Sequence, residues 1–294
     1  PVMPRCLVAL VAMSVLLASC GIDDADSSTA ATPTEALATT GPTATVTPDG
    51  TPAELVRVLD GDSIEAQLSG TTVEVRLVGI NAPERDECHG DAARDALADY
   101  LEGKSLTLVA NGDEDTDRFG RLLRYVYAEG SGVAETMLTS GHANVLQGDY
   151  SREDAFVALT DDAVHAELGM WRPNACGPPL ATTLRVTTVE YDPRGPDRDN
   201  AAQEYVVITN AGDAPLDLTD WIVRDESSQH RYHFPPITLA PGASLRLRSG
   251  CGDDGGDDLY WCAGDAVWSN GGDTVLLQDP NGNVVDRVLY RGDY

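Results

Sequence analysis

The sequence predicts a multidomain protein: an α+β domain at residues 54–177, in which five strands close into a small barrel with three helices, and an all-β sandwich at residues 182–294. In the first region, apolar residues alternate over short runs and then recur at helical spacing, which favours a mixed domain. After residue 184, short strand-like runs recur with turns between them, which favours a sandwich. The string PNACGPP at 173–179 marks the boundary.

The first 20 residues resemble an export signal. Arg5 precedes an apolar run, 7–18, that is too short to span a bilayer and has the proportions of a secretory signal. The run ends in LASC, which resembles the bacterial lipobox, whose cysteine becomes the lipidated first residue of the mature protein. We therefore expect an extracytoplasmic protein, anchored to the cell membrane through Cys20 or released by processing. An ordinary signal peptide with an incidental cysteine is the alternative.

Residues 21–53 are expected to form a disordered tether. They hold nine Thr and four Pro and no aromatic residue. Such a stretch cannot bury enough apolar surface to fold, and its prolines favour an extended chain. The tether would therefore act as a spacer between the membrane and the folded domains.

The barrel prediction rests on the order of strands and turns. Tight turns at DGD, 60–62, and SG, 69–70, join the first three strands into a meander. Five strands with interposed and trailing helices suit a closed barrel such as the oligonucleotide-binding barrel. The expected strands are 55–59, 64–68, 73–77, 106–109 and 122–127, and the expected helices begin near residues 93, 133 and 151.

The position of Asp62 suggests a functional role in addition to packing. It shares strand parity with Ile64, so its carboxylate should lean toward the apolar face at the end of the strand. An unpaired buried carboxylate is costly, and a metal ion or an arginine would offset that cost. Asp60 lies two residues back and can project in a similar direction. The alternative is a turn-forming Asp-Gly pair with solvated side chains.

Three strings extend this interpretation. VLDGDSIEAQ, VRLVGINAPE and TDRFGRLLRYVY occur in this order within residues 54–175, and together they resemble the staphylococcal-nuclease family. The resemblance implies a calcium-dependent endonuclease that hydrolyses phosphodiester bonds of DNA or RNA, leaving 5′-hydroxyl and 3′-phosphate ends. It implies a nuclease-type barrel with three helices.

The resemblance also assigns roles by motif position. Two arginine forks and a divalent cation would neutralise charge on the phosphate, and a carboxylate would activate water. The implied calcium ligands are Asp62, Asn81 and the backbone carbonyl of Ala82, with Asp60 in the outer shell; Glu84 is the implied general base; Arg76 and Arg121 would bind the phosphate; and Arg118, Phe119 and Tyr150 would contact the substrate.

The sequence departs from the family pattern at three of these positions. Asn81 stands where the family often has Asp, so calcium affinity should fall, or the preference should shift toward Mg²⁺ or another divalent ion. Phe119 stands where a tyrosine is common, and Tyr150 is the one retained member of a tyrosine pair. Stacking on nucleotide bases should therefore be weaker.

The cysteines that follow Cys20 predict two disulfides. Four remain, an even number in a chain expected to be exported. The pairs Cys88–Cys176 and Cys251–Cys262 each stay within one candidate domain, so we expect these two bridges.

The second domain has its own resemblance. The strings EYVVITNAGDAPLDLTDWIVRD, FPPITLAPGASLRLRSG and WSNGGDTVLLQDPNGNVVDRVLY resemble the lamin-tail domain, an immunoglobulin-like sandwich associated with binding and attachment. That family offers no enzymatic motif to transfer, so the sandwich's ligand stays unknown. We expect a monomer in which Trp221, Trp261 and Trp268 serve packing.

Two other function classes stay open at this point. The net charge of −28 argues against a protein held to nucleic acid by its overall field. Asn81, the acidic surface and the few aromatic residues leave open a barrel that holds nucleic acid or glycan without cutting it. A structural surface protein with a vestigial barrel is the second alternative. Retention of Asp62, Arg76, Glu84 and Arg121 together argues against it.

Overall fold

The computed structural model describes residues 49–294, except 113–114, 181–182, 197–199, 228 and 293–294. The described residues belong to one compact unit, Ala44–Tyr294. The predicted signal, its Cys20 and the tether up to residue 48 lie outside the described residues. Within the described ranges, no helix combines the length and apolarity that a membrane crossing needs.

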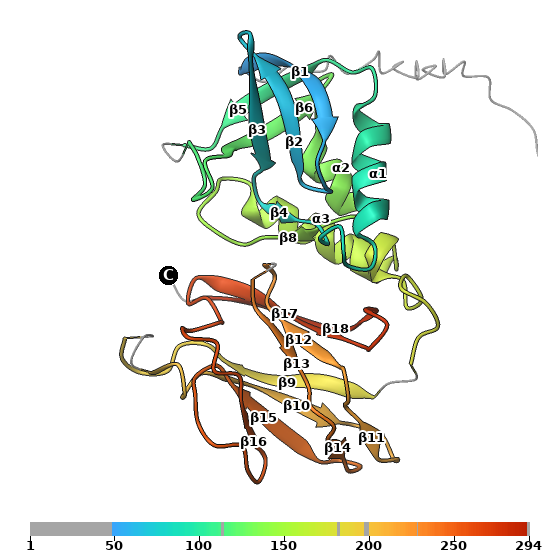
Figure 1. Ribbon diagram of the computed structural model, residues 1–294, viewed down its shortest axis with the longest axis vertical. Helices are drawn as coiled ribbons and strands as arrows, with labels where there is room; N and C mark the ends of the chain where they lie inside the picture. Colours follow the sequence, from blue (N-terminus) through green and yellow to red (C-terminus); the bar gives the residue numbers. More distant parts are fainter. Residues whose placement is uncertain (1–48, 113–114, 181–182, 197–199, 228, 293–294) are drawn as a thin grey trace, which may run out of the picture. The chain divides into compact units, whose positions relative to one another are not determined.

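Five strands close a barrel in the first domain, as the sequence predicts (Figure 1). Neighbouring strands run antiparallel in the order β3-β2-β1-β5-β6, and a parallel pairing of β3 with β6 closes the ring. The strands are β1 (Thr51–Val58), β2 (Ser63–Leu68), β3 (Thr71–Leu77), β5 (Leu106–Ala110) and β6 (Leu122–Ala128), and the short β7 (Ser131–Gly132) extends β6.

The first strand begins earlier than expected. β1 starts at Thr51, inside the predicted tether, because Thr51 to Ala53 pair with Leu108 to Leu106 of β5. The partner strand lies more than fifty residues further along the chain, so Thr/Pro composition alone gave no indication of it. The tether prediction is therefore wrong for its last three residues.

Three helices and one pair of short strands complete this domain. The apolar faces of α1 and α3 bury Ala93, Leu97 and Phe156 in the same core as the barrel residues Ile64 and Val75. The helices are α1 (Gly90–Leu101), α2 (Val133–Thr139), α3 (Glu153–His165) and the 3₁₀ turn η1 (Gly169–Trp171), and β4 (Ile80–Asn81) pairs with β8 (Asn144–Val145).

The second domain is a sandwich of two four-stranded sheets, as expected. One sheet has the order β16-β15-β10-β9 and the other β13-β12-β17-β18, with β11 and β14 paired beside them. The strands are β9 (Leu184–Glu190), β10 (Tyr205–Asn210), β11 (Leu216–Asp217), β12 (Ile222–Arg224), β13 (Arg231–His233), β14 (Thr238–Leu239), β15 (Ser244–Arg248), β16 (Asp258–Tyr260), β17 (Gly272–Gln278) and β18 (Val284–Arg291).

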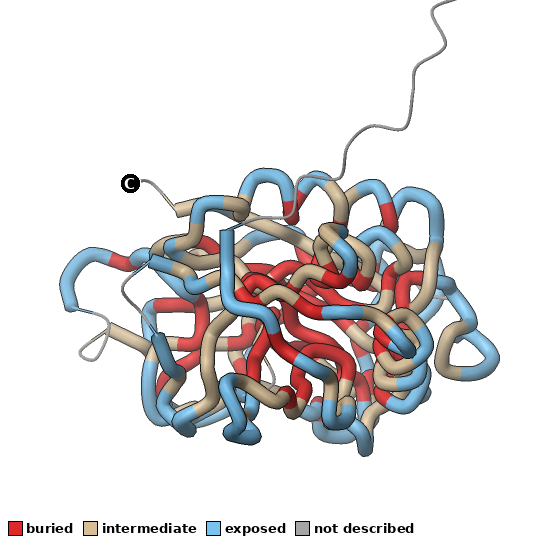
Figure 2. The backbone as a smooth tube through the Cα atoms, turned by 90° about the horizontal axis from the view of Figure 1, so that it is seen from above, coloured by how far each residue is buried: buried red, intermediate tan, exposed pale blue. Residues whose placement is uncertain are grey.

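Residues from both sheets share one hydrophobic core. Val206 and Leu247 of one sheet lie in the same buried cluster as Val275 of the other, and Trp221 and Trp268 are almost fully buried in it. Figure 2 shows the buried positions gathered in the interior, with exposed positions along the peripheral loops. The tryptophans therefore have the packing role that the sequence predicts, with Trp261 partly buried at the edge.

Both predicted disulfides are present. Cys88 pairs with Cys176, at a sequence separation of 88, and Cys251 pairs with Cys262, at a separation of 11. The first bridge joins the segment that precedes α1 to the end of the barrel domain. The second closes a loop that contains β16.

Buried carboxylates cluster beside β12 and β17. Asp225, Glu226 and Asp273 are each no more than 5% exposed. Burial raises the pKa of Glu226 to about 7 and, together with the charges of Glu226 and Asp225, raises that of Asp273 well above its ordinary value. Hydrogen bonds from Gln147 and Thr274 to Glu226 oppose the shift without cancelling it. The neutral form of Glu226 is therefore the better tolerated one.

Raising the pH from about 5 to about 8 should destabilise the wild-type chain relative to Glu226→Gln. The folded pKa lies above the unfolded one, so the carboxyl's stabilising contribution is complete below its ordinary value of 4.5 and is lost as the pH rises through about 7. Glutamine mimics the neutral acid and does not titrate. Melting temperatures of both chains, measured at each pH, should diverge in favour of the variant at high pH; parallel shifts would contradict the expectation.

Candidate active site

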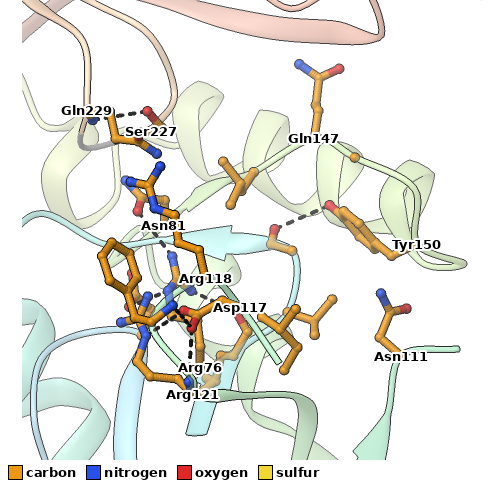
Figure 3. Close-up of a pocket in the computed structure, with 18 of the residues that line it drawn as sticks. Arg76, Asn81, Asn111, Asp117, Arg118, Arg121, Gln147, Tyr150, Ser227 and Gln229 are labelled. Carbon is orange, nitrogen blue, oxygen red and sulfur yellow. Dashed lines mark hydrogen bonds and ion pairs between the residues drawn. The ribbon is translucent and has the colours of Figure 1, made fainter. Parts of the chain in front are cut away.

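One cavity at the rim of the barrel collects most of the predicted site residues (Figure 3). Its volume is about 750 Å³. It is lined by polar side chains from several separate elements, including loops at 60–62, 81–84, 117–121 and 146–150. The predicted residues in its wall are Asp60, Asp62, Arg76, Asn81, Glu84, Arg118, Phe119, Arg121 and Tyr150. Ala82 is buried beside them and is not part of the wall.

Asp62 is the centre of the buried part of the site. Its Oδ1 accepts a hydrogen bond from Ser63 Oγ at 2.9 Å and lies 3.1 Å from Arg76 Nε, and its Oδ2 accepts a hydrogen bond from the Ala82 amide at 2.7 Å. The preceding Gly61 permits this approach, since a Cβ there would lie only 2.5 Å from that of Ala82. The predicted inward orientation of Asp62 and its arginine partner are both present.

Arg76 is more completely engaged than a free phosphate-binding arginine. Its Nη1 donates to the carbonyls of Leu77 at 2.8 Å and Ile80 at 2.7 Å, and its Nη2 donates to Asn81 Oδ1 at 3.2 Å. The side chain is only 11% exposed. In this arrangement Arg76 links Asp62 to the Asn81 strand and also borders the cavity.

The electrostatics around Asp62 favour an additional positive charge. Burial raises the pKa of Asp62 to about 6, and the charge of Asp60 adds to the rise, although Arg76 and two hydrogen bonds act against it. Arg76 alone therefore does not offset the cost of burying this carboxylate.

The oxygen donors around the cavity could bind a hard cation if neutral groups complete the coordination. Asp60, Asp62, Asn81 and Glu84 all border the cavity, and carboxylate and amide oxygens are the ligands that Ca²⁺ and Mg²⁺ prefer. In the described part of the chain, no three His, Cys, Asp or Glu side chains converge as a metal cluster. A cation here would therefore depend on Asn81, a backbone carbonyl and water beside Asp62.

Arg121 lies next to the Asp62–Arg76 pair and is linked to it through Ser63. Its Nε lies 2.7 Å from Asp117 Oδ2, and its Nη1 donates to Ser63 Oγ at 3.2 Å. Asp117 Oδ1 in turn accepts hydrogen bonds from the amides of Phe119 and Arg121, each at 2.9 Å. Burial works to raise the pKa of Asp117, but these hydrogen bonds from Arg121 and Phe119 hold it below its ordinary value.

Asp117 is a site residue to which the motif comparison above assigns no role. The available signal was the spacing of Asp117, Phe119 and Arg121, which is typical of an aspartate that accepts hydrogen bonds from the amides two and four residues ahead.

Glu84 lies at a tight turn before α1. Its amide donates to Glu87 Oε2 at 2.8 Å, and the Glu87 amide donates back to the Glu84 carbonyl at 2.9 Å. A Cβ at Gly90 would lie 1.9 Å from that same carbonyl, so the turn requires a glycine there. Glu84 is half-buried and reaches the cavity wall, which suits a carboxylate that contacts water.

The predicted substrate residues differ in exposure. Phe119 is 70% exposed, with the guanidinium carbon of Arg118 4.7 Å and that of Arg121 5.5 Å from its ring centre. Tyr150 is half-buried against Phe156, and its hydroxyl donates to the Gly79 carbonyl at 3.3 Å. Phe119 is therefore the better placed of the two to stack on an incoming ring.

Two residues of the second domain also line the cavity, and sequence reasoning missed both. Ser227 and Gln229 come from the loop between β12 and β13. No local pattern in this loop indicates contact with a site in the other domain.

The first domain is a closed five-stranded barrel with a cavity at its rim. Carboxylates and arginines line this cavity, which is typical of a site that binds an anionic substrate. The comparisons with known proteins agree. The family model described as "Staphylococcal nuclease homologue" matches residues 74–173, and the one described as "Lamin Tail Domain" matches residues 179–292. The chain belongs to the staphylococcal nuclease homologues and carries a lamin tail domain after the nuclease domain.

Curated relatives match the nuclease domain. An "Uncharacterized endonuclease" of Escherichia coli O157:H7 is 36% identical over 118 residues, which cover 40% of this chain and 74% of the relative. A "Micrococcal nuclease" of Shigella flexneri is 34% identical over 136 residues, which cover 42% of this chain and 76% of the relative. The "SPbeta prophage-derived endonuclease YokF" of Bacillus subtilis is 30% identical over 129 residues, covering 41% and 44%.

Proposed function

We propose that this chain is an endonuclease of the thermonuclease type, which hydrolyses phosphodiester bonds of DNA, RNA or both. The observation that carries the proposal is the convergence of Asp62, Glu84, Arg76 and Arg121 on one cavity. The family membership and the nuclease names of the relatives support it. The phosphodiester of a nucleic acid carries the negative charge that guanidinium groups bind.

The proposed reaction is attack of water on phosphorus. Glu84 takes a proton from the water, the water oxygen bonds to phosphorus, and the bond from phosphorus to the 5′ oxygen breaks. The leaving oxygen takes a proton from solvent, so the products are a 5′-hydroxyl and a 3′-phosphate. Arg121, supported by Arg76, stabilises the charge that grows on the phosphate oxygens.

The proposed cofactor is Ca²⁺, or Mg²⁺ if the neutral Asn81 shifts the preference. Asp62, Asn81 and the carbonyl of Ala82 would hold the ion, with Asp60 in its outer shell. When bound, the ion would neutralise phosphate charge and lower the pKa of a coordinated water. Phe119 and Tyr150, with Arg118, would contact the sugar and base next to the phosphate.

The proposed location is the cell surface, where Cys20 would carry the lipid anchor and residues 21–48 would serve as spacer, unless processing releases the protein. We also propose that it acts as a monomer, with a still unidentified ligand for the lamin tail domain. Incorporation of a labelled fatty acid into the wild-type protein but not into Cys20→Ala tests the anchor; equal labelling of both would refute it.

Cleavage of single-stranded DNA and of RNA by the purified chain tests the proposed activity. We expect cleavage with Ca²⁺ or Mg²⁺, no cleavage with a chelator, and 3′-phosphate ends on the products. Asp62→Ala should raise the metal concentration needed for half-maximal rate, because it removes the buried carboxylate of the proposed ligand set. Binding without cleavage under every metal condition would instead favour the alternative of a non-catalytic binding protein.

A further inference from the structure

The loop between β12 and β13 of the lamin tail domain borders the cavity of the nuclease domain. Ser227 and Gln229 of this loop lie in the cavity wall and are labelled in Figure 3. The two strands that flank this loop end and begin with arginines, Arg224 and Arg231. Both arginines form ion pairs with Glu87 of the nuclease domain, so the loop is fixed to that domain by charged contacts.

Arg224 and Arg231 hold one carboxylate between them. Arg224 Nη1 donates to Glu87 Oε1 at 3.1 Å and to Oε2 at 3.3 Å, and Arg231 Nη2 forms an ion pair with Glu87 Oε1. The side chains of Arg224 and Glu87 are only 6% and 15% exposed. Withdrawal of these charges from water is costly, so the pair requires close geometry on both sides.

Glu87 passes this restraint to the candidate general base. Glu87 Oε2 accepts hydrogen bonds from Arg224 Nη1 and from the Glu84 amide, the latter at 2.8 Å. The Glu87 amide in turn donates to the Glu84 carbonyl. Gly90 closes the same turn from the other side, since its α-carbon packs directly on the Glu84 carbonyl. A continuous chain of polar contacts therefore runs from two arginines of the lamin tail domain to the backbone of Glu84.

A second contact holds another part of the cavity wall. Glu226 Oε1 accepts a hydrogen bond from the Gln147 amide at 2.5 Å, and its Oε2 accepts one from Gln147 Nε2 at 3.1 Å. The neighbouring Leu146 amide donates to the Gly79 carbonyl at 2.9 Å. Leu146 and Gln147 both line the cavity, so the same β12–β13 region is bonded to the wall that ends at Tyr150.

We propose that the lamin tail domain is a working part of the nuclease active site, in which Arg224 and Arg231 are positioning residues that fix Glu84 through Glu87. The inference rests on the proposed function for the role of Glu84. A general base acts only within hydrogen-bond reach of the proton that it takes, and a displacement of about 1 Å can cost roughly 100-fold in rate. An interface that served attachment alone would have no need to bond the turn that carries Glu84.

Arg231→Gln is the test variant. Arg231 is 27% exposed, and Arg224 stays in place to pair with Glu87, so the fold should survive the change. The matched control is Arg248→Gln, which removes one of two arginines, Arg246 and Arg248, that hold Asp258 within the same domain. Arg231→Lys restores the charge and serves as the conservative variant.

Two readouts separate positioning from general stability. Hydrogen exchange of the amides at 84–90 reports the turn without any need for activity, and steady-state kinetics on DNA report its consequence. In Arg231→Gln we expect faster exchange at 84–90 and a roughly 10- to 100-fold lower kcat with little change in KM. Arg231→Lys should recover part of both effects, and Arg248→Gln should change neither.

Each other outcome is informative. Unchanged exchange, or faster exchange with an unchanged kcat, overturns the positioning role. An equal loss in Arg248→Gln also overturns it, because the effect would then be one of domain stability. If the wild-type chain cleaves nothing under any metal condition, the proposed function fails, and the exchange data alone decide whether this domain holds the Glu84 turn.

Discussion

Arg121→Ala should lower kcat for phosphodiester hydrolysis roughly 100- to 1,000-fold, the loss found when one preorganised donor to a developing oxyanion is removed. Asp117 and Ser63 use two of the five N–H groups of this guanidinium and hold it against the cavity. The remaining donors can meet a phosphate whose negative charge grows in the transition state. Initial rates at saturating substrate and metal measure the change.

A matched control separates this effect from a general loss of positive charge. Arg57 also lies on the barrel and pairs with one acid, Glu65, but its side chain is 63% exposed and away from the cavity lining. Arg57→Ala should leave kcat within about twofold, since exposed ion pairs contribute little. Arg121→Lys should recover only part of the rate because an ammonium cannot form the two-pronged contact. Equal rates for Arg121→Ala and the wild type would remove Arg121 from the mechanism.

Sequence reasoning succeeded where the determining interactions are local. The alternation of Ile64 with polar neighbours predicted a half-buried strand, and the glycine-containing turns predicted the meander of the first three strands. The inward orientation of Asp62 followed from strand parity alone, and the structure confirms it. The cysteine pairs followed from domain membership, because each bridge joins two cysteines of the same predicted domain.

The rest depends on contacts between distant residues, which leave no periodic trace. Arg224 meets Glu87 across 137 positions, and Asp62 accepts the Ala82 amide across 20. Thr51 becomes a strand residue only because β5 supplies its partner. The motif positions predicted which side chains meet in the cavity, but they did not predict that Arg76 would be so fully occupied by backbone acceptors.

Removal of the Cys88–Cys176 bridge should cause a large loss of stability. The bridge closes a loop of 88 residues, for which the chain-entropy estimate is about 4.6 kcal/mol at 25 °C. Measured losses for native disulfides span roughly 2–5 kcal/mol, so we expect Cys88→Ser/Cys176→Ser to lose that much free energy of unfolding. Equilibrium denaturation in urea measures it.

The second bridge provides the internal comparison. Cys251–Cys262 closes a loop of only 11 residues, for which the same estimate gives about 2.8 kcal/mol. Cys251→Ser/Cys262→Ser should therefore be the less destabilised variant, by roughly 2 kcal/mol, because a short loop loses less entropy when it closes. The Cys88 bridge also follows directly on the Glu84 turn, so its loss should lower nuclease activity, whereas loss of the Cys251 bridge should not. A larger loss of stability from the short loop would show that strain or local packing, and not the entropy of the unfolded chain, sets the contribution of these bridges.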